Sequence, residues 1–427
     1  DLPVDIQNSF LTNNKLKKLS YDKPNYSITK EIRSISKALK RSRRPIILLG
    51  HGVKISGAKK DAEKLIEHLN CPFVVSWGGF DIISHYHKNF IGHIGVYGDR
   101  GANYAIQNCD LLISIGSRLD TRQTGGSLET FSRESFKVMV DIDPEEINKN
   151  RGIKIDVPVV CDAKQFINDL INNSSSLELD HSWLEYIDNV KKIKENRGVK
   201  KSDLSSYEFL SSLNEKIPDN SIIIPDEGGN LVWTMQSIKI RSNQKLYSNF
   251  GNSSMGYAVP SAIGSCIANN GPVICIDGDG GIQMNIQELQ TIKHYNLPIK
   301  IFILNNNCYG IIKQFQDSYF NKRYIATESK DYSAPDFVRV ASAYGINAYK
   351  ATKDNYEEII NLALNSNGPT LVDVIIDKGQ KLIPKLEYGN PLEDMSPYQT
   401  DEQIKTNMII KTIPRRDNSS GWVNLKK

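Results

Sequence analysis

The chain has 427 residues, which is long enough for two or three domains that each bury a core. Its formal net charge of +4 is small and its lysines are scattered, so binding to nucleic acid is not indicated. No apolar run approaches the length of a membrane span, and the six cysteines form no CxxC pair, so we expect free thiols in a cytoplasmic protein.

Apolar runs and the breaks between them divide the chain into five segments. Residues 1–25 are a polar connector, 26–172 a first α/β domain, 173–204 a linker, 205–378 a second α/β domain and 379–427 a tail. The strands expected in the first domain are 45–49, 72–75, 110–115, 137–142 and 157–161. The tail holds four prolines and no convincing core pattern, so we expect it to wrap irregularly over the domain or the active site. The predicted fold class is α/β, with two doubly wound parallel sheets.

Polar motifs follow two neighbouring apolar runs of the second domain. Gly278-Asp279-Gly280 comes after the run 272–276, and Asn305-Asn306 comes after the run 299–304. Both runs are typical of buried parallel strands, and residues 284–295 are expected to form the crossover helix between them. The two motifs would therefore lie at the carboxyl ends of adjacent strands, where ligands bind in open α/β sheets.

These residue types favour a cation that bridges a diphosphate. Gly278, Gly280 and Gly281 let backbone amides approach anionic oxygens. Asp279 and Asn306 offer the hard oxygen atoms that Mg²⁺ or Ca²⁺ prefers. The alternative is a glycine-rich turn with a capping aspartate, followed by an ordinary Asn-Asn turn. The pairing of both motifs across one intact βαβ unit argues against that alternative.

The same segments carry a resemblance to a known family. Four stretches, DGDG at 277–280, MNIQEL at 284–289, LP at 297–298 and LNN at 304–306, resemble the thiamine diphosphate (ThDP) motif of acetolactate synthase-like enzymes. The resemblance implies Mg²⁺ ligands at Asp279, at the Asn306 side chain and at the main-chain carbonyl of Cys308. It also places Tyr309 and Gly310 in the cofactor site.

Two more stretches resemble parts of that site. PDEGGN at 225–230 is similar to the turn that holds the other side of the diphosphate, and the residues concerned are Gly228, Gly229 and Asn230. NSSMGY at 252–257 contains Ser253 and Met255, and it resembles the segment whose apolar residue wedges under the cofactor. Met255 is the matching position and is implied to take part in catalysis by forcing the cofactor rings into a bent conformation. Taken alone, without the surrounding motif, Met255 is better interpreted as core filler, which is the usual role of methionine.

The resemblance implies a reaction as well as a cofactor. In the bent cofactor, an exocyclic amine reaches the thiazolium C2 proton, and the cofactor then carries out the decarboxylation of a 2-oxo acid. A second carbonyl compound, or a proton, captures the remaining fragment. Simple decarboxylation or oxidation is the rival within the same class.

The first domain offers a second candidate site. Gly50-His51-Gly52 and Gly116-Ser117-Arg118 each follow an expected strand. Asp141 and Asp143 could bind ribose hydroxyls, or could cap the helix that begins near Pro144, and the residues alone favour capping.

Four stretches of this domain, GANYA at 101–105, DLL at 110–112, RLDTR at 118–122 and VDIDPEEI at 140–147, resemble the central domain of acetolactate synthases, which often holds FAD. The implied FAD residues are Gly50, Gly52, Arg118, Asp141 and Asp143. In some members of that family the central site is empty or repurposed. A flavin or nicotinamide oxidoreductase is the alternative of a different class, and the missing full GxGxxG with a downstream acid disfavours it.

Two positions depart from the family pattern. Tyr97 stands where the family has a histidine near the flavin, and Phe315 stands where it has a tryptophan that shapes the pocket of the second substrate. A smaller ring at Phe315 leaves room for a different or bulkier acceptor. The stretch EYGNPLED at 387–394 resembles the tail of acetolactate synthase-like proteins from surface-polysaccharide gene clusters, so a keto sugar is the leading variant of acceptor.

The resemblance also implies partners. The family's catalytic glutamate lies on an amino-terminal pyrimidine-binding domain, and DLPVDI at 1–6 resembles the closing strand of that domain. We therefore expect this chain to be the carboxyl-terminal part of a longer enzyme, and a separate chain with that domain, or a catalytically silent binding subunit, are the alternatives. The substrates would be a 2-oxo acid, most simply pyruvate, and a carbonyl acceptor. The active unit would be a homodimer or tetramer, with no nucleic acid or membrane as partner.

Overall fold

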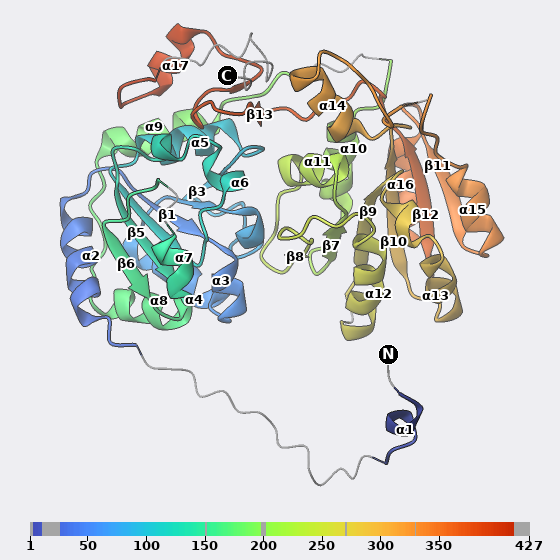
Figure 1. The fold of residues 1–427 in the computed structure, drawn as a ribbon, viewed down its shortest axis with the longest axis horizontal. Coiled ribbons are helices and arrows are strands. Elements are labelled where there is room, and N and C mark those ends of the chain that lie inside the picture. The colour runs from blue at the N-terminus through green and yellow to red at the C-terminus, as the bar shows by residue number, and fades with distance from the viewer. Residues whose placement is uncertain are drawn as a thin grey trace.

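The computed structural model describes residues 3–10, 26–149, 152–197, 202–269, 271–328 and 330–413. Two parallel sheets with helices on their faces stand side by side in Figure 1, the first blue to green and the second yellow to orange. The predicted fold class is confirmed. Before the first sheet, a short helix α1 covers Val4–Gln7. Within the described residues, no helix combines the length and the apolar character that a membrane crossing requires.

The first sheet has the order β3-β2-β1-β4-β5-β6, with every pair parallel. Its strands are β1 Pro45–Leu49, β2 Phe73–Val75, β3 Phe90–His93, β4 Leu111–Ile115, β5 Phe136–Asp141 and β6 Val157–Val160. Its α-helices are α2 Thr29–Arg41, α3 His51–Ile55, α4 Lys59–Leu69, α5 Arg100–Asn108, α6 Thr121–Thr124, α7 Pro144–Asn148 and α8 Ala163–Asn172, with 3-10 turns at Trp77–Gly79 and Leu128–Thr130. Strands are added on one side of β1 up to β3 and on its other side from β4 onward. The carboxyl ends of β1 and β4 therefore mark the expected ligand-binding position of this sheet.

All five strands predicted for this domain are present, and β3 is an addition that the sequence did not indicate. Its residues Phe90–His93 include one glycine and one histidine and follow a polar stretch, so they show no apolar run. The five predicted strands could be recognised because they are continuous apolar runs. In β1, for example, every residue is buried, because helices cover both faces of a parallel sheet.

The second sheet has the order β11-β12-β10-β9-β7-β8 and is also parallel throughout. Its strands are β7 Ile222–Pro225, β8 Lys245–Leu246, β9 Val273–Gly278, β10 Ile299–Asn305, β11 Asn347–Ala351 and β12 Thr370–Ile375. Its helices are α10 Ser206–Lys216, α11 Gly229–Ser237, α12 Ala258–Ala268, the 3-10 turn Ile282–Asn285, α13 Glu288–His294, α14 Gly310–Tyr319, α15 Phe337–Ala343 and α16 Tyr356–Asn365. The reversal of strand order falls between β7 and β9, and the predicted crossover between β9 and β10 consists of the 3-10 turn and α13.

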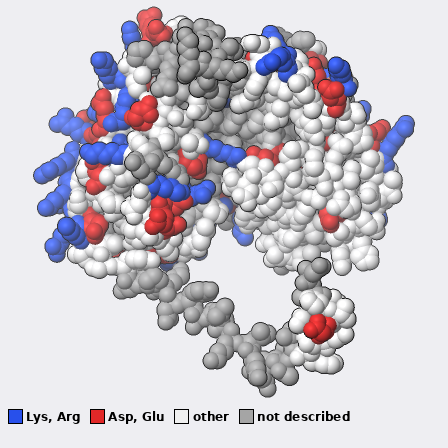
Figure 2. Space-filling model, viewed as in Figure 1, with Lys and Arg blue, Asp and Glu red and all other residues white. Residues whose placement is uncertain are grey.

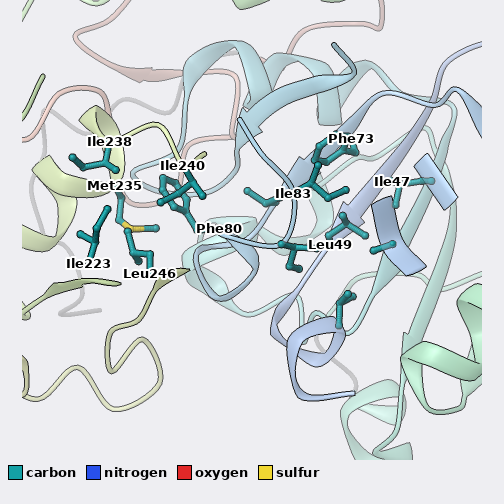
Figure 3. Packing of buried hydrophobic residues seen from close by; sticks show 14 of the residues in the cluster. Ile47, Leu49, Phe73, Phe80, Ile83, Ile223, Met235, Ile238, Ile240 and Leu246 are labelled. Carbon is teal, nitrogen blue, oxygen red and sulfur yellow. The ribbon is translucent and has the colours of Figure 1, made fainter. Parts of the chain in front are cut away.

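A continuous apolar core joins the two domains. Figure 3 shows Ile47, Leu49 and Phe73 of the first sheet in the same cluster as Ile223 and Leu246 of the second. Phe80 and Ile240 lie between them and are almost fully buried. Because this core is shared, the two domains pack directly against each other.

The linker and tail return the chain to the first domain. Helix α9, His181–Lys191, packs on α5, and the tail contains the strand pair β13 Lys385–Leu386 and β14 Met395–Ser396 and the helix α17 Asp401–Asn407. In Figure 1 the red tail passes from the second domain over the first. Residues 414–427 of the expected tail lie outside the described residues.

The tail contributes side chains to the core of the first domain, although its sequence shows no continuous core pattern. Six of its apolar side chains are buried in a cluster with the first domain, namely Leu386, Leu392, Met395, Ile404, Met408 and Ile410. Pro391 and Pro397 interrupt the first half of this set, and Ile404 and Met408, on α17 and at its C-cap, have a helical spacing, so the packing reveals most of these residues.

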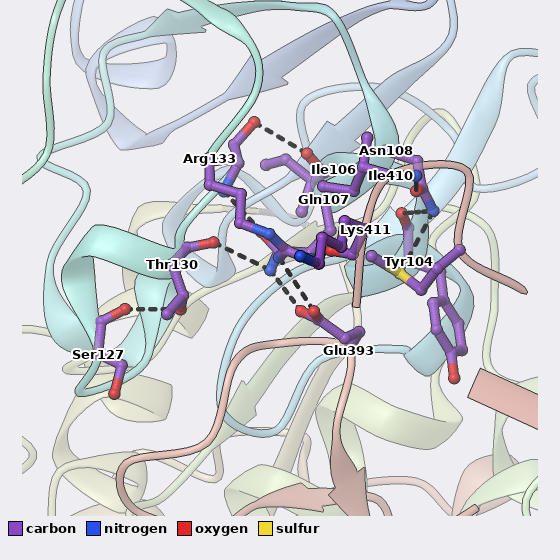
Figure 4. A network of polar contacts seen from close by, with 12 residues as sticks. Tyr104, Ile106, Gln107, Asn108, Ser127, Thr130, Arg133, Glu393, Ile410 and Lys411 are labelled. Atoms are coloured by element: carbon purple, nitrogen blue, oxygen red, sulfur yellow. Dashed lines mark hydrogen bonds and ion pairs between the residues drawn. The ribbon is translucent and has the colours of Figure 1, made fainter. Parts of the chain in front are cut away.

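Buried polar contacts hold the tail in place, as Figure 4 shows. Glu393 is 1% exposed, accepts a hydrogen bond of 2.5 Å from Gln107 Nε2 and pairs with Arg133 at 3.0 Å. The Asn108 side chain accepts from the backbone N–H of Ile409 at 2.7 Å. Arg100 donates to the carbonyl oxygens of Met395 and Pro397, both at 3.0 Å. The tail is thus an ordered part of the fold and lies close to the seam between the domains.

Candidate cofactor site

Asp279 stands at the carboxyl end of β9 and is 3% exposed. One carboxylate oxygen accepts a hydrogen bond from the backbone N–H of Gly280 at 3.1 Å, and the other is buried with no hydrogen-bond partner among the described residues. Burial raises the pKa of Asp279 to about 7. A buried carboxylate oxygen without a partner is costly, and a bound cation would satisfy it.

Asn306 and Cys308 follow β10 at the same edge of the sheet. Asn305 turns inward and donates to Asp373 at 2.9 Å, which leaves Asn306 as the asparagine at the edge of the site. The Cys308 thiol points to the carbonyl of Lys378 at 3.8 Å, and burial raises its pKa to about 11. The main-chain oxygen of Cys308 is the atom predicted above as the third ligand.

Histidine, cysteine and acidic side chains do not gather into a metal-binding group of three or more anywhere in the described part of the chain. One carboxylate, one amide oxygen and one carbonyl are instead the hard oxygen atoms that suit Mg²⁺ when a diphosphate completes the coordination. The residues present fit such an ion.

Glycines bring the polar turns into close contact. A Cβ atom on Gly281 would lie 2.3 Å from Asp226 Oδ2 and 2.4 Å from Asp277 Oδ1. A Cβ on Gly280 would lie 2.3 Å from the Tyr309 ring, and one on Gly310 would lie 2.6 Å from Asn306 Nδ2. The turns that carry the predicted residues Gly280, Gly281, Asn306, Tyr309 and Gly310 are therefore in close contact.

The other side of the crevice is the turn before α11. Gly228 has a φ of +120°, which glycine adopts readily, and α11 begins at Gly229 without a side-chain cap, so its first amides are available to an anion. Asn230 donates to the Glu227 carbonyl at 3.1 Å, while its own amide oxygen is buried without a partner in the described structure. A Cβ on Gly278 would lie 3.1 Å from Asn230 Nδ2, so the β7 and β9 turns touch.

Asp226 is a positioning residue that the sequence analysis missed. Its carboxylate accepts from the backbone N–H groups of Gly256 and Ala258, both at 3.0 Å, and so holds the loop that carries Met255. Asp277 lies beside it, and burial followed by the Asp226 charge raises the pKa of Asp277 well above its usual value. An acidic residue directly after β7 was the available signal, but its target is 30 residues away.

The remaining predicted residues are Met255, Ser253 and Phe315. Met255 is 38% exposed, so it is not core filler in this structure. Ser253 has a φ of +57° and accepts a hydrogen bond from Arg122 of the first domain. Phe315 on α14 is 45% exposed, and its ring centroid lies 4.6 Å from that of Tyr319.

A cavity of about 680 Å³ lies at the β1 and β4 ends of the first sheet. Gly52, Arg118 and Asp141 line it. Gly50 is not among the lining residues, but a Cβ there would lie 2.2 Å from the Gly116 carbonyl oxygen. Asp143 is also outside the lining, and it caps α7 by accepting from the Glu145 N–H at 2.9 Å. The structure thus places three of the five predicted residues on this cavity, and Asp143 acts as a helix cap.

One end of this cavity meets the second domain. Trp77 and Tyr97 are stacked there with ring centroids 6.1 Å apart, and Phe250 and Gly251 of the second domain complete the wall. The cavity is large enough for a nucleotide-sized group, and Asp141, whose pKa burial raises, stands at a strand end where ribose hydroxyls are commonly bound.

Comparison with known proteins assigns both domains to one family. Residues 32–170 match the family described as thiamine pyrophosphate enzyme, central domain, and residues 226–374 match thiamine pyrophosphate enzyme, C-terminal TPP binding domain. The chain therefore belongs to the thiamine pyrophosphate enzyme family. Thiamine pyrophosphate is ThDP, so the predicted family is confirmed and the second domain is a ThDP-binding domain.

Relatives resemble this chain over most of its length. Probable acetolactate synthase large subunits of Methanococcus aeolicus and Methanocaldococcus jannaschii are each 34% identical to it, over 90% and 95% of this chain and 67% and 71% of their own lengths. The Escherichia coli (strain K12) acetolactate synthase isozyme 2 large subunit is 31% identical over 86% of this chain and 66% of its own length. The chain spans about two thirds of the length of these relatives.

Proposed function

We propose that this protein catalyses the ThDP- and Mg²⁺-dependent decarboxylation of a 2-oxo acid and joins the remaining fragment to a second carbonyl compound. The observation that carries the proposal is the buried, unpartnered oxygen of Asp279 among the glycine turns at the β7 and β9 strand ends. The similarity to acetolactate synthase large subunits supports the reaction type. Bound ThDP would supply the electron sink for the decarboxylation.

Different residues would bind different parts of that cofactor. Asp279, the Asn306 side chain and the Cys308 carbonyl would hold Mg²⁺, and the amides of Gly228 and Gly229 at the start of α11 would face the diphosphate. Met255 would support the cofactor rings from a loop that Asp226 fixes. Phe315 would line the approach of the second carbonyl compound.

The test of the reaction is carbon dioxide release from pyruvate by the full-length protein. We expect release only when both ThDP and Mg²⁺ are present, and removal of the metal with a chelator should stop it. Oxidation of a substrate by bound flavin with no need for ThDP would contradict the proposal.

Phe315→Trp should lower ligation onto the natural acceptor while changing carbon dioxide release much less. The larger indole would narrow the approach beside Tyr319, and a steric mismatch of this kind costs about 10–200-fold in rate. Carbon dioxide and coupled product are measured separately. Tyr295→Trp, an exposed aromatic position beyond the end of α13, is the matched control. Equal loss of both activities, or loss of neither, would show that Phe315 does not select the acceptor.

We also propose FAD in the central cavity and a homo-oligomeric active unit. The FAD proposal is supported by the volume of the central cavity and by three of its lining residues, Gly52, Arg118 and Asp141. Exposed apolar side chains at the mouth of the cofactor crevice, Met255, Met284, Ile312 and Phe315, support the second, because a second subunit would cover them. Light scattering with flavin absorbance on the same sample tests both, and a colourless monomer with full activity would contradict them.

The domain limits 26–172 and 205–378 are part of the proposal. Helix α8 ends at Asn172, α10 begins at Ser206 and β12 ends at Ile375, which supports these limits.

A further inference from the structure

A second cavity lies where the first domain, the linker and the last turn of α11 meet. Its volume is about 500 Å³, and it shares no lining residue with the central cavity or with the cofactor site described above. One wall comes from α5 and α9, and the opposite wall comes from residues 235–239 at the end of α11. In Figure 1, α5 and α9 stand on the first domain and α11 stands on the second. A cavity of this size can hold a small organic molecule.

Basic side chains predominate around this cavity. Its lining contains the basic residues Arg100, Lys191, Lys194, Arg197 and Lys239 and the acidic residues Asp99 and Glu195. Arg100 neutralises Glu195 through two hydrogen bonds, at 2.6 Å and 3.1 Å. Asp99 lies 3.0 Å from Nδ1 of His93 and accepts from the backbone N–H of His93 at the same distance. Four cations therefore surround one further carboxylate, which already has its hydrogen-bond donors.

These four cations have no carboxylate partner among the described residues. Lys191 donates to the Lys88 carbonyl at 3.1 Å, and Arg197 donates to a backbone carbonyl of α11 at 3.0 Å. Both acceptors are neutral oxygen atoms, so the two charges stay uncompensated. The ammonium groups of Lys194 and Lys239 make no hydrogen bond or ion pair within the same part of the chain.

Exposed cations alone do not define a site. In Figure 2, lysine and arginine side chains are spread over the first domain, as is usual for a solvated surface. The four cations of this cavity differ because the linker and the end of α11 bring them around one concave surface. Like charges gathered in this way repel one another, and a bound anion would relieve that repulsion.

A buried hydroxyl without a partner marks the α11 wall. Ser237 is the last residue of α11, and its Oγ atom is buried and makes no hydrogen bond in the described structure. Such an unpaired group is unfavourable, and an anionic oxygen would accept a hydrogen bond from it. Apolar side chains, including Phe90 and Ile238, form other parts of the lining. The cavity thus offers cations, a hydroxyl donor and apolar surface for a carbon skeleton.

Helix α11 connects this cavity with the cofactor turn. It begins at Gly229, whose amide is proposed to face the diphosphate, and it ends at Ser237. Gln236 is held on both sides, because its Oε1 accepts from the Tyr207 hydroxyl and its Nε2 donates to the Pro384 carbonyl, both at 2.8 Å. The 9 residues of α11 span about 13 Å and form one rigid element. A ligand that ties the last turn to the first domain would therefore also steady the first turn.

We propose that this cavity is an effector site for a small organic molecule that carries a phosphate group. A phosphate group bears a charge of about −1.5 to −2 at pH 7 and three acceptor oxygens. It therefore suits several unmatched cations and a hydroxyl donor better than a single carboxylate does. The bound molecule would join α9 to α11 and so strengthen ThDP binding at the other end of α11. The site is separate from the one proposed for the reaction, and its test needs no catalytic activity.

Calorimetry on the full-length protein saturated with ThDP and Mg²⁺ measures binding of glucose 6-phosphate and glycerol 3-phosphate, with glucose and glycerol as their uncharged counterparts. We expect the phosphates to bind and the uncharged compounds not to bind. The double variant Lys194→Gln with Lys239→Gln should weaken phosphate binding at least about 10-fold. Ser237→Ala should weaken it about 10-fold, because a charged acceptor loses its donor. Lys37→Gln with Lys60→Gln, at exposed positions of α2 and α4, removes the same charge and should bind like the wild type.

The effector role is tested by titrating ThDP in the presence and absence of the phosphate that binds more tightly. ThDP affinity should rise about 5-fold or more, and the rise should be absent in the Lys194→Gln, Lys239→Gln double variant. ThDP affinity that does not rise in the wild type would overturn the effector role.

The binding results decide the site itself. Failure of both phosphates to bind, or equal binding of the uncharged compounds, would overturn it. Unchanged phosphate binding in the Lys194→Gln, Lys239→Gln double variant would do the same, because the phosphate would then bind elsewhere. Equal weakening in the Lys37→Gln, Lys60→Gln control would assign the effect to net charge and would also overturn the site.

Discussion

Replacing Asp279 with alanine is expected to abolish binding of Mg²⁺ and ThDP while the fold stays intact. The buried carboxylate is the only charged protein ligand in the proposed set, and its loss leaves the ion with two neutral protein oxygen atoms. Loss of an outer-shell partner already weakens metal binding about 10–100-fold, and a direct ligand should cost more. Strand β9 is held by its apolar residues and by both neighbouring strands, so it does not depend on this side chain.

Calorimetry on the full-length protein measures the affinity, and circular dichroism checks the fold. Asp354→Ala, at an exposed turn of the same domain, is the matched control and should bind ThDP like the wild type. Unchanged ThDP affinity in Asp279→Ala would remove the metal bridge from the proposal.

Gly281→Ala should damage the same site through packing alone. The backbone of Gly281 is in the right-handed helical region, at a φ of −65° and a ψ of −50°, so alanine meets no conformational barrier there. Its methyl group would, however, lie 2.3 Å and 2.4 Å from the carboxylate oxygens of Asp226 and Asp277. Overpacking of this kind costs about 1–3 kcal/mol and would displace the Met255 loop that Asp226 holds, so ThDP affinity should fall together with stability.

The comparison for this variant is Gly264→Ala on α12. No heavy atom lies within 4 Å of the added methyl group, and alanine in a helix is favoured over glycine by about 1 kcal/mol, so this variant should be as stable as the wild type or more so. Denaturant unfolding and ThDP titration are measured on both. Equal stability and affinity of Gly281→Ala and the wild type would show that the two carboxylates can move apart freely.

The sequence by itself determined the fold class and which of the two domains belongs to the ThDP-binding family. Buried parallel strands need continuous apolar runs, and such runs stand before Gly278-Asp279-Gly280 and Asn305-Asn306, so both the strands and the polar residues at their ends were readable. The family followed from the same motifs, since their order and spacing are specific, and the comparisons confirmed it. The individual site residues stay predictions that the structure brings together around one crevice.

Only the tertiary structure decided what lies between the domains. The pairing of Arg122 with Glu227, the attachment of Ser253 to Arg122 and the contact of Leu386 with Val96 join residues more than 100 positions apart, and such contacts leave no periodic signal in the sequence. The burial of the tail against the first domain was hidden for the same reason. Helix and strand patterns report the nearest neighbours of a residue along the chain, whereas the charges and rings of the seam acquire their partners only when the two sheets pack.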